Sequence, residues 1–376
     1  MDPALPATNL QLRSTITPEG RLELSLQPAL TPAPNAGELL VRVEAAPINP
    51  GDLGLLLGPA DLSTLRAEGH RTTAKVPQAL MSSVAGRLGQ SLPVGVEGAG
   101  VVIAAGPDAA SQALVGRTVA MFGGGLFAQH RIVRTEDALA LPDGTRPADG
   151  ASAFANPLTA LGMVETMRLE GHTALVHTAA ASNLGQMLNR ICLKDGVGLV
   201  NIVRSAAQAK LLAEMGSAHV VDSSLATFPE DLVAAVAATG ATLAFDAVGG
   251  GNSANDILGA MERALAAKGG VYSRYGSSVR KQVYIYGGLS PGPTELARSY
   301  GMAWGVGGWI LTGFLARIGP AGVQRLRHRV VDELTTTFRS RYAAEISLRD
   351  VLRPEIIAAL QRKGTGGKYL VNPARD

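Results

Sequence analysis

The rhythm of hydrophobic and polar positions changes along this chain near residue 153. From about Leu10 to Leu141, short apolar runs alternate with polar positions and end at Gly, Pro, Asp or Asn, which is typical of strands. The clearest runs are ELLVRVEAAPI (38–48), GVEGAGVVIAAG (95–106) and GRTVAMFGGGLFAQHRIV (116–133). The pattern predicts a mainly β domain over residues 1–152. Residues 58–92 lack strand alternation, so we expect a loop or helical insertion there.

After a helix that begins near Asn156, apolar strands alternate with amphipathic helices. This order implies right-handed crossovers and a parallel, doubly wound sheet. The fold class is therefore α/β, with a Rossmann domain over residues 153–319. A C-terminal segment, 320–376, ends in a short strand and is expected to return to the first domain. The predicted Rossmann strands are TALVHT (173–178), GLVNIV (198–203), AHVVD (218–222), TLAFDAV (242–248) and GGVYSRYG (269–276).

Composition excludes several classes of protein. Apolar residues make up 46% and charged residues 17%, which indicates a globular chain. The 34 basic and 31 acidic residues give a net charge of only +3, without a basic stripe interleaved with aromatics, so no nucleic-acid partner is expected. Cys192 is the only cysteine, which excludes an intrachain disulfide framework and favours a reduced, cytoplasmic setting.

No membrane association is expected either, because the chain lacks a signal segment and any apolar run near the ~20 residues of a spanning helix. The most apolar stretch is GMAWGVGGWILTGFL (301–315). Monomers seldom expose such a surface, so this stretch indicates a buried segment or the interface of a homodimer.

The stretch HTAAASNLGQ (177–186) lies where a dinucleotide-binding protein carries its glycine-rich turn, but it has one glycine. In this position a loop aims the first N–H groups of the next helix at a pyrophosphate. The Ser182 hydroxyl and Asn183 amide can add hydrogen bonds, and Gly185 allows the helix to pack closely on the strand. By itself, the loop fits an ordinary strand-to-helix connection equally well.

The next strand favours the nucleotide interpretation. It ends at Arg204, and 204 minus 185 places this residue 19 positions after Gly185. A dinucleotide fold has an acid there for a free ribose 2′-hydroxyl, or a base for a 2′-phosphate. No Asp or Glu lies at this turn, so Arg204 predicts NADPH rather than NADH and disfavours a methyltransferase-like fold; the alternative is a solvated surface arginine.

Several stretches occur together in a recurring order: INPGDL (48–53), GVEGAGVV (95–102), NPLTALGM (156–163), AAASNLGQ (179–186), FDAVGG (245–250) and GGKYLVNP (366–373). With them the chain resembles the medium-chain dehydrogenase/reductase superfamily, specifically its zinc-free quinone oxidoreductases and 2-enoyl thioester reductases. The resemblance implies a GroES-like β catalytic domain beside the Rossmann domain. It places the following residues at NADPH: Ser182, Asn183 and Leu184 at the pyrophosphate, Arg204 at the 2′-phosphate, Thr159 beside the nicotinamide, Tyr275 and Gly276 after the last central strand, and Trp309 and Lys368 at the rim of the cleft.

The departures from this superfamily also matter. Zinc-dependent relatives have His followed by Glu where this chain has Val96, and the six histidines show no ligand-like spacing, so no metal is expected. The tyrosine that enoyl reductases of this type carry shortly after the INP motif is absent. Asn49 is the candidate catalytic residue, as a polar group of the pocket, with Asp52 fixing its loop; the alternative is a turn whose side chains only satisfy backbone groups.

The function expected from the sequence is hydride transfer from NADPH to a small-molecule electron acceptor, a quinone or another activated alkene or carbonyl compound. Two alternatives remain open. One is a 2-enoyl thioester reductase, which needs a proton donor near the substrate oxygen. The other is an NADPH-binding protein of low turnover.

Overall fold

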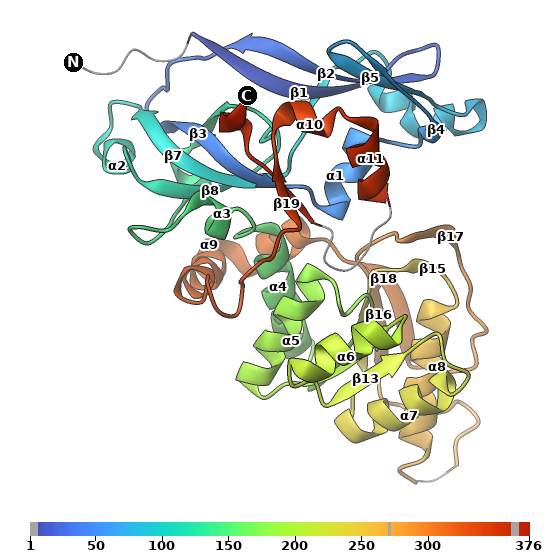
Figure 1. Ribbon diagram of the computed structural model, residues 1–376. Helices are drawn as coiled ribbons and strands as arrows, with labels where there is room; N and C mark the ends of the chain where they lie inside the picture. The colour runs from blue at the N-terminus through green and yellow to red at the C-terminus, as the bar shows by residue number, and fades with distance from the viewer. Residues whose placement is uncertain (1–6, 270–271, 362–367) are drawn as a thin grey trace. The chain divides into compact units, whose positions relative to one another are not determined.

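The computed structural model describes residues 7–269, 272–361 and 368–376 (Figure 1). The chain forms two compact units, which we call the β unit, residues 1–155 with 331–376, and the Rossmann unit, residues 156–330. The predicted boundary at 319/320 falls inside helix α9 (Leu311–Asp332), at a kink where Gly319 has φ 68° and ψ 177° and Pro320 follows. Proline cannot continue the helical hydrogen bonding, so the kink has a local cause.

The β unit contains two sheets. The first has the order β4-β5-β2-β1-β6; the second has the order β10-β8-β7-β3-β20-β19, with β9 also paired to β3. The strands are β1 (Thr8–Ile16), β2 (Arg21–Leu30), β3 (Glu38–Pro47), β4 (Asp61–Glu68), β5 (Arg71–Lys75), β6 (Leu92–Pro93), β7 (Glu97–Ala105), β8 (Thr118–Phe122), β9 (His130–Arg134), β10 (Leu139–Ala140), β19 (Ala344–Ile346) and β20 (Tyr369–Val371).

Strands β3 and β7 form the centre of the second sheet, where the sequence predicted two strands. Their alternate side chains, among them Val41, Val43 and Val102, enter one core with Leu12 and Phe127. The glycines of the GVEGAGVV stretch permit this pairing at close range. A Cβ on Gly100 would lie 2.0 Å from the carbonyl oxygen of Arg42, so no larger residue fits between the strands.

The expectation of a loop or helical insertion at residues 58–92 is wrong for residues 61–75, which form strands, and agrees with the structure at residues 78–87, which are helical. Strands β4 and β5 form an antiparallel hairpin, β5 pairs with β2, and a 3-10 helix follows at Gln78–Arg87. The outer strand β4 has no fully buried residue, and its burial alternates only over its first four positions. An edge strand with little buried surface has no period-2 apolar signal, which is why the sequence pattern missed it.

The C-terminal residues complete the β unit. Strand β20 pairs parallel with β19 and antiparallel with β3. Strands β20 and β3 are far apart in the sequence but adjacent in the sheet (Figure 1). The short helices of this unit are α1 (Pro50–Leu56), α2 (Ala109–Gln112), α3 (Pro147–Gly150), α10 (Leu348–Val351) and α11 (Pro354–Gln361).

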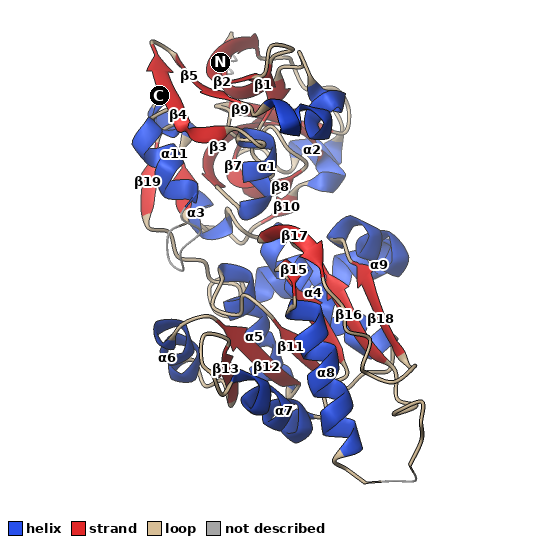
Figure 2. Cartoon of the chain, turned by 90° about the vertical axis from the view of Figure 1, so that its right-hand side faces the viewer, coloured by secondary structure: helices blue, strands red, loops and turns tan. Residues whose placement is uncertain are grey.

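The Rossmann unit is a six-stranded parallel sheet of order β13-β12-β11-β14-β16-β18, flanked by helices (Figure 2). Together with the antiparallel sheets of the β unit, it confirms the predicted α/β fold class. The strands are β11 (Ala174–His177), β12 (Gly198–Val203), β13 (His219–Asp222), β14 (Leu243–Asp246), β16 (Lys281–Ile285) and β18 (Trp304–Gly308), with a small pair β15 (Gly249–Gly251) and β17 (Ser290–Thr294). The helices are α4 (Ala155–Leu169), α5 (Asn183–Asp195), α6 (Ala206–Glu214), α7 (Phe228–Thr239), α8 (Ser253–Ala266) and α9.

Of the strand predicted at GGVYSRYG (269–276), residues 270–271 lie outside the described residues and residues 272–276 form a loop, so that part of the prediction is wrong; the fifth strand of the sheet is β16. Tyr272 is 89% exposed and Tyr275 55% exposed, in a loop that precedes β16. The first position of β16 is Lys281, which is fully buried and paired with Glu262 at 2.6 Å. A buried lysine hides the start of the strand from a hydrophobicity pattern, since lysine is almost never fully buried unless paired.

Within the described ranges, no helix has both the length and the apolar character needed to cross a membrane.

Candidate functional site

The loop after β11 and the start of α5 form the nucleotide-like end of the Rossmann unit. Ser182 is the N-cap of α5, and its hydroxyl accepts a hydrogen bond from the Gly185 N–H at 3.1 Å. The N–H groups of a first helical turn have no partner inside the helix, and the helix dipole favours an anion in front of them. The structure thus places Ser182, Asn183 and Leu184 together at the capped N-terminus of α5.

Gly185 is the position in this loop where only glycine fits. A Cβ there would lie 2.2 Å from the carbonyl oxygen of Ala180, closer than any real contact, and its nearest neighbours are all backbone atoms. Ala179, in the same loop, has a φ of 51°, in the region that glycine occupies most readily. The chain therefore makes the close turn with alanine where glycine-rich loops use glycine, and keeps the glycine that packing requires.

Arg204 directly follows β12, the strand beside β11 in the sheet, and its side chain is exposed. Its backbone N–H donates to the Gln208 side chain at 3.1 Å, and Ser205 caps helix α6. The carboxyl ends of parallel strands lie at one edge of a sheet, so Arg204 follows its strand at the same edge as the loop after β11. Arg204 and the loop after β11 therefore lie at one edge of the sheet, on neighbouring strands.

Asp246, at the end of β14, organises the same edge and was not predicted as a site residue. It is fully buried and accepts hydrogen bonds from the Thr178 hydroxyl at 2.8 Å and from the Val248 and Gly249 N–H groups at 2.9 and 3.1 Å. The FDAVGG stretch carried the signal, an acid at the end of an apolar strand followed by two glycines. Asp246 joins the loops after β11 and β14.

Tyr286 and Gly287 directly follow β16, the position that the family resemblance implied for Tyr275 and Gly276. The latter two precede β16, at the opposite end of the strand, so the prediction that they follow the last central strand is wrong. The Tyr286 hydroxyl lies 2.8 Å from Nε2 of His177, the last residue of β11. Burial lowers the pKa of His177 to about 3, so this imidazole is neutral at working pH.

Thr159 and Trp309 differ in whether their polar side-chain groups form hydrogen bonds within the described residues. Thr159 lies on α4, is partly exposed, and its hydroxyl has no hydrogen bond within the described residues. Trp309, directly after β18, donates from Nε1 to the Thr166 hydroxyl at 3.1 Å and packs edge-on against Phe245 at 5.6 Å. The Trp309 indole N–H therefore serves packing within the Rossmann unit, whereas the Thr159 hydroxyl remains available.

A second group of polar residues lies inside the β unit, around Asn49. Asp52 accepts from the Asn49 N–H and the Val96 N–H, both at 2.8 Å, and so fixes the loop as expected. Glu97, fully buried, accepts from Asn49 Nδ2 at 2.9 Å and from the N–H groups of Phe154 and Ala155 at 3.2 and 2.7 Å. Glu97 thus ties three separate segments together, a role the sequence analysis missed.

The contact with Glu97 fixes what Asn49 can offer a ligand. A carboxylate accepts only, so the amide nitrogen of Asn49 must face Glu97, and Oδ1 faces away. Asn49 Oδ1 is buried and has no hydrogen-bond partner in the part of the chain that the structure describes. Asn49 therefore presents an acceptor, suited to a ligand hydroxyl or N–H rather than to an anion.

Lys368, at the start of β20, belongs to the same unit. Its Nζ donates to the Ser152 hydroxyl at 2.7 Å, and Ser152 lies 2.9 Å from the Tyr342 hydroxyl. Nζ also stands 5.7 Å from the centre of the Tyr342 ring. The lysine predicted at the rim of the cofactor cleft is thus the end of a hydrogen-bond chain within the β unit.

The charged groups of this cluster shift one another's ionisation. Burial raises the pKa of Asp52 to about 7, helped by the charge of Glu97 and opposed by the two N–H donors and by Lys368. Burial lowers the pKa of Lys368 to about 8, opposed by Glu97 and Asp52. Desolvation is the larger effect for both, because each loses more from leaving water than it gains from its neighbours.

We expect Asp52 to make the stability of the protein depend on pH. The folded state keeps this carboxyl protonated where the unfolded chain, with the usual pKa of 3.8, has lost the proton. The stabilisation is therefore complete below about pH 4 and is lost as the pH rises to about 7. Urea unfolding at several pH values tests this: Asp52→Asn should have a shallower pH dependence than the wild type across this window, and equal slopes would contradict the assignment.

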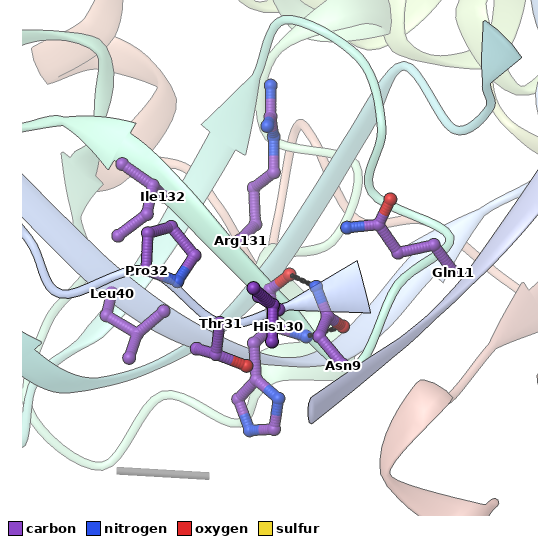
Figure 3. A pocket seen from close by; sticks show the side chains of 9 residues that line it. Asn9, Gln11, Thr31, Pro32, Leu40, His130, Arg131 and Ile132 are labelled. Atoms are coloured by element: carbon purple, nitrogen blue, oxygen red, sulfur yellow. Dashed lines mark hydrogen bonds between the residues drawn. The ribbon is translucent and has the colours of Figure 1, made fainter. Parts of the chain in front are cut away.

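One cavity of about 220 Å³ opens elsewhere on the β unit (Figure 3). The apolar side chains of Pro32, Leu40 and Ile132 gather on one side of it, and Asn9 is hydrogen-bonded to the backbone of His130. None of the predicted site residues lines this cavity. Across the described residues, no group of three or more His, Cys, Asp or Glu side chains is arranged to hold a metal ion.

Comparison with curated proteins finds distant relatives. The chain is 25% identical to the mouse synaptic vesicle membrane protein VAT-1 homolog over 238 residues, 62% of this chain and 52% of that protein. It is 28% identical to bovine mitochondrial enoyl-[acyl-carrier-protein] reductase over 255 residues, 65% of this chain and 59% of that protein. The chain spans about half the length of the first relative and less than two thirds of the second. No family model matches it.

Comparison with solved structures finds the same fold over nearly the whole chain. A protein of Mesorhizobium loti assigned as an NADPH:quinone reductase has a TM-score of 0.74 and 24% identity, covering 99% of this chain and 100% of its own. A mycobacterial protein solved in complex with NADPH has a TM-score of 0.66 and 19% identity, covering 96% and 100%. At these identities the likeness establishes the fold.

Proposed function

Because this chain has the fold of the medium-chain dehydrogenase/reductase superfamily and resembles its quinone oxidoreductases and enoyl reductases, we propose that it is a zinc-independent, NADPH-dependent oxidoreductase. The acceptor is a quinone or another activated alkene or carbonyl compound. When bound, NADPH supplies the hydride. The protein binds and orients cofactor and acceptor and excludes water.

The observation that carries this proposal is the shared edge of β11 and β12. The capped start of α5, with Ser182, Asn183 and Leu184, fits a pyrophosphate, and Arg204 follows the neighbouring strand as the only charged residue of its turn. The guanidinium group binds phosphate oxygens with parallel N–H donors. An acid at this position would exclude the 2′-phosphate, so the arrangement supports NADPH over NADH.

Arg204→Ala is expected to weaken NADPH binding about 10- to 100-fold, because charge-assisted hydrogen bonds contribute roughly 1.5–3 kcal/mol. NADH binding should change less than twofold, since it has no 2′-phosphate. Titrations of the full chain with each nucleotide, followed by nicotinamide fluorescence, measure both affinities.

Arg66→Ala is the control for charge alone, because Arg66 is an exposed arginine on the β4 strand of the other unit. Its affinity for NADPH should equal that of the wild type. If neither nucleotide binds the wild-type protein, the loop after β11 is an ordinary connection and the proposed function fails.

Enoyl thioester reduction is the second candidate, favoured by the 28% identity to bovine mitochondrial enoyl-[acyl-carrier-protein] reductase. Steady-state oxidation of NADPH with a panel of quinones, enones and 2-enoyl thioesters distinguishes the two. Tight NADPH binding without turnover on any acceptor would instead indicate a binding protein.

We also propose a homodimer formed through β18. This strand lies at one end of the six-stranded sheet, so one of its edges has no partner strand within the Rossmann unit as described. Met302 and Ile310, on either side of it, are 75% and 68% exposed. Exposed apolar residues beside an open edge favour pairing with a second copy. Light scattering on the eluting protein gives the mass that tests this.

A further inference from the structure

The hydrogen bonds from Lys368 through Ser152 to Tyr342 have a fixed direction. An ammonium group has three donors and no acceptor, so the Ser152 oxygen must accept from Lys368. The Ser152 hydroxyl hydrogen is then free to donate to the Tyr342 oxygen, 2.9 Å away. The three residues come from separate parts of the chain, before α4, before β19 and at the start of β20, and only the fold joins them.

Lys368 keeps donor capacity that the described residues do not use. The neighbouring carboxylates of Asp52 and Glu97 accept from Asn49 and from backbone N–H groups, and neither forms an ion pair with Lys368 within the described ranges. Ser152 is therefore the single hydrogen-bond acceptor of Nζ in the described protein. Two N–H bonds of the ammonium group remain for a ligand.

We propose that Lys368 donates the proton that completes reduction of the acceptor, and that Ser152 and Tyr342 return a proton to it. This inference rests on the proposed function. It supplies the acid that is missing from the INPGDL stretch, where the chain has no tyrosine.

The step balances as follows. The acceptor gains a hydride at carbon or oxygen, and its electron pair moves to the remote oxygen, giving a hydroquinone anion or an enolate. That anion takes a proton from Lys368 Nζ, which becomes a neutral amine able to accept a hydrogen bond. Once Nζ is neutral, the two hydroxyl groups turn, so that Ser152 donates to the amine and Tyr342 donates to Ser152. The amine then takes the Ser152 proton, Ser152 takes that of Tyr342, and Tyr342 is reprotonated from solvent. The net reaction consumes one NADPH and one proton for each acceptor reduced.

The ionisation of Lys368 is consistent with this role. An acid acts best when its pKa lies near the working pH, and burial has lowered this pKa to about 8. The charged or titratable groups that face the ammonium are Glu97 on β7, Asp52 on α1 and Tyr342. Turnover limited by proton donation should therefore fall as the pH rises above about 8.

Two classes of variant distinguish proton donation by Lys368 from the reprotonation of Lys368 through Ser152 and Tyr342. Lys368→Arg keeps the positive charge but not an acid of usable pKa, so kcat should fall on the order of 100-fold and the decline near pH 8 should disappear. Ser152→Ala and Tyr342→Phe keep Lys368, so the first turnover in a stopped-flow experiment should run at the wild-type rate while steady-state turnover slows about 10-fold. Tyr272→Phe, in an exposed loop of the Rossmann unit, is the matched control.

The pKa of Lys368 can also be measured in the free protein, without cofactor or acceptor. Competitive labelling with acetic anhydride across pH, followed by mass spectrometry of the peptide that contains Lys368, reports its pKa in the free protein. The labelling curve should have a midpoint near pH 8 in the wild type, and Ser152→Ala should move it. Fluorescence titration should show NADPH affinity within twofold of wild type for Ser152→Ala and Tyr342→Phe.

The outcomes are distinguishable. If Lys368→Arg weakens NADPH binding but keeps the kcat and pH profile of the wild type, Lys368 is a cofactor contact only and the inference is overturned. It is also overturned if both Ser152→Ala and Tyr342→Phe, folded as judged by circular dichroism, show wild-type steady-state rates. If the wild type fails to oxidise NADPH with every acceptor of the panel, the proposed function itself fails, and this inference fails with it.

Discussion

Glu97→Ala should lower the free energy of unfolding by about 3–5 kcal/mol, because it removes a buried acceptor to which three donors are hydrogen-bonded. The side chain is fully buried and accepts from Asn49 Nδ2, the Phe154 N–H and the Ala155 N–H. A methyl group cannot accept these three hydrogen bonds and leaves a cavity in place of the carboxyl group. Urea unfolding followed by circular dichroism measures the change, and a thermal scan should show a decrease on the order of 10 °C.

Glu97→Gln is the matched control for this prediction. The amide has the shape of the carboxyl group and keeps one acceptor oxygen, so at least one of the three donors retains its partner. Its cost should be well below that of alanine. Equal stability of Glu97→Ala and the wild type would show that Glu97 does not hold these segments together.

Gly185→Ala is the second large effect, and it should remove NADPH binding, with a Kd raised at least on the order of 100-fold. The added Cβ would lie 2.2 Å from the Ala180 oxygen and 2.6 Å from the Ala180 carbonyl carbon. These are backbone atoms, so the loop after β11 and the start of α5 must move apart. Overpacking of this kind costs roughly 1–3 kcal/mol of stability. Nucleotide titration and urea unfolding of the variant measure the two effects separately.

Gly259→Ala provides the contrast on α8 of the same unit. A Cβ at Gly259 meets no atom within 4 Å, so the variant should bind NADPH as the wild type does. Because alanine loses less backbone entropy than glycine in a helix, it should gain about 0.5–1 kcal/mol of stability. Wild-type NADPH affinity in Gly185→Ala would contradict the role of the loop.

The sequence carried the fold class and the superfamily resemblance, and both are confirmed by the α/β architecture, the solved structures and the distant curated relatives. The apolar strands β11, β12 and β14 were found because each is buried on both faces and reads as a continuous apolar run. The loop around Ser182 and Arg204 lie directly after β11 and β12, as the strand pattern predicted, and their contact with a phosphate stays a prediction. The local order of apolar and polar residues is enough to locate buried strands and the loops that follow them.

Other residues carried no local signal. The β4–β5 hairpin lacks sustained alternation, because β4 is largely exposed and β5 buries three consecutive residues. The buried Lys281 conceals the start of β16, which misplaced Tyr275 and Gly276 and left Tyr286 unnoticed. The tertiary structure also decided that Asn49 faces Glu97, and that Ser152, Tyr342 and Lys368 form one hydrogen-bond chain. Residues up to 216 positions apart meet in that chain. Periodicity reports which face of an element is buried, whereas long-range polar pairing depends on how separate elements are packed, so only the folded protein could show it.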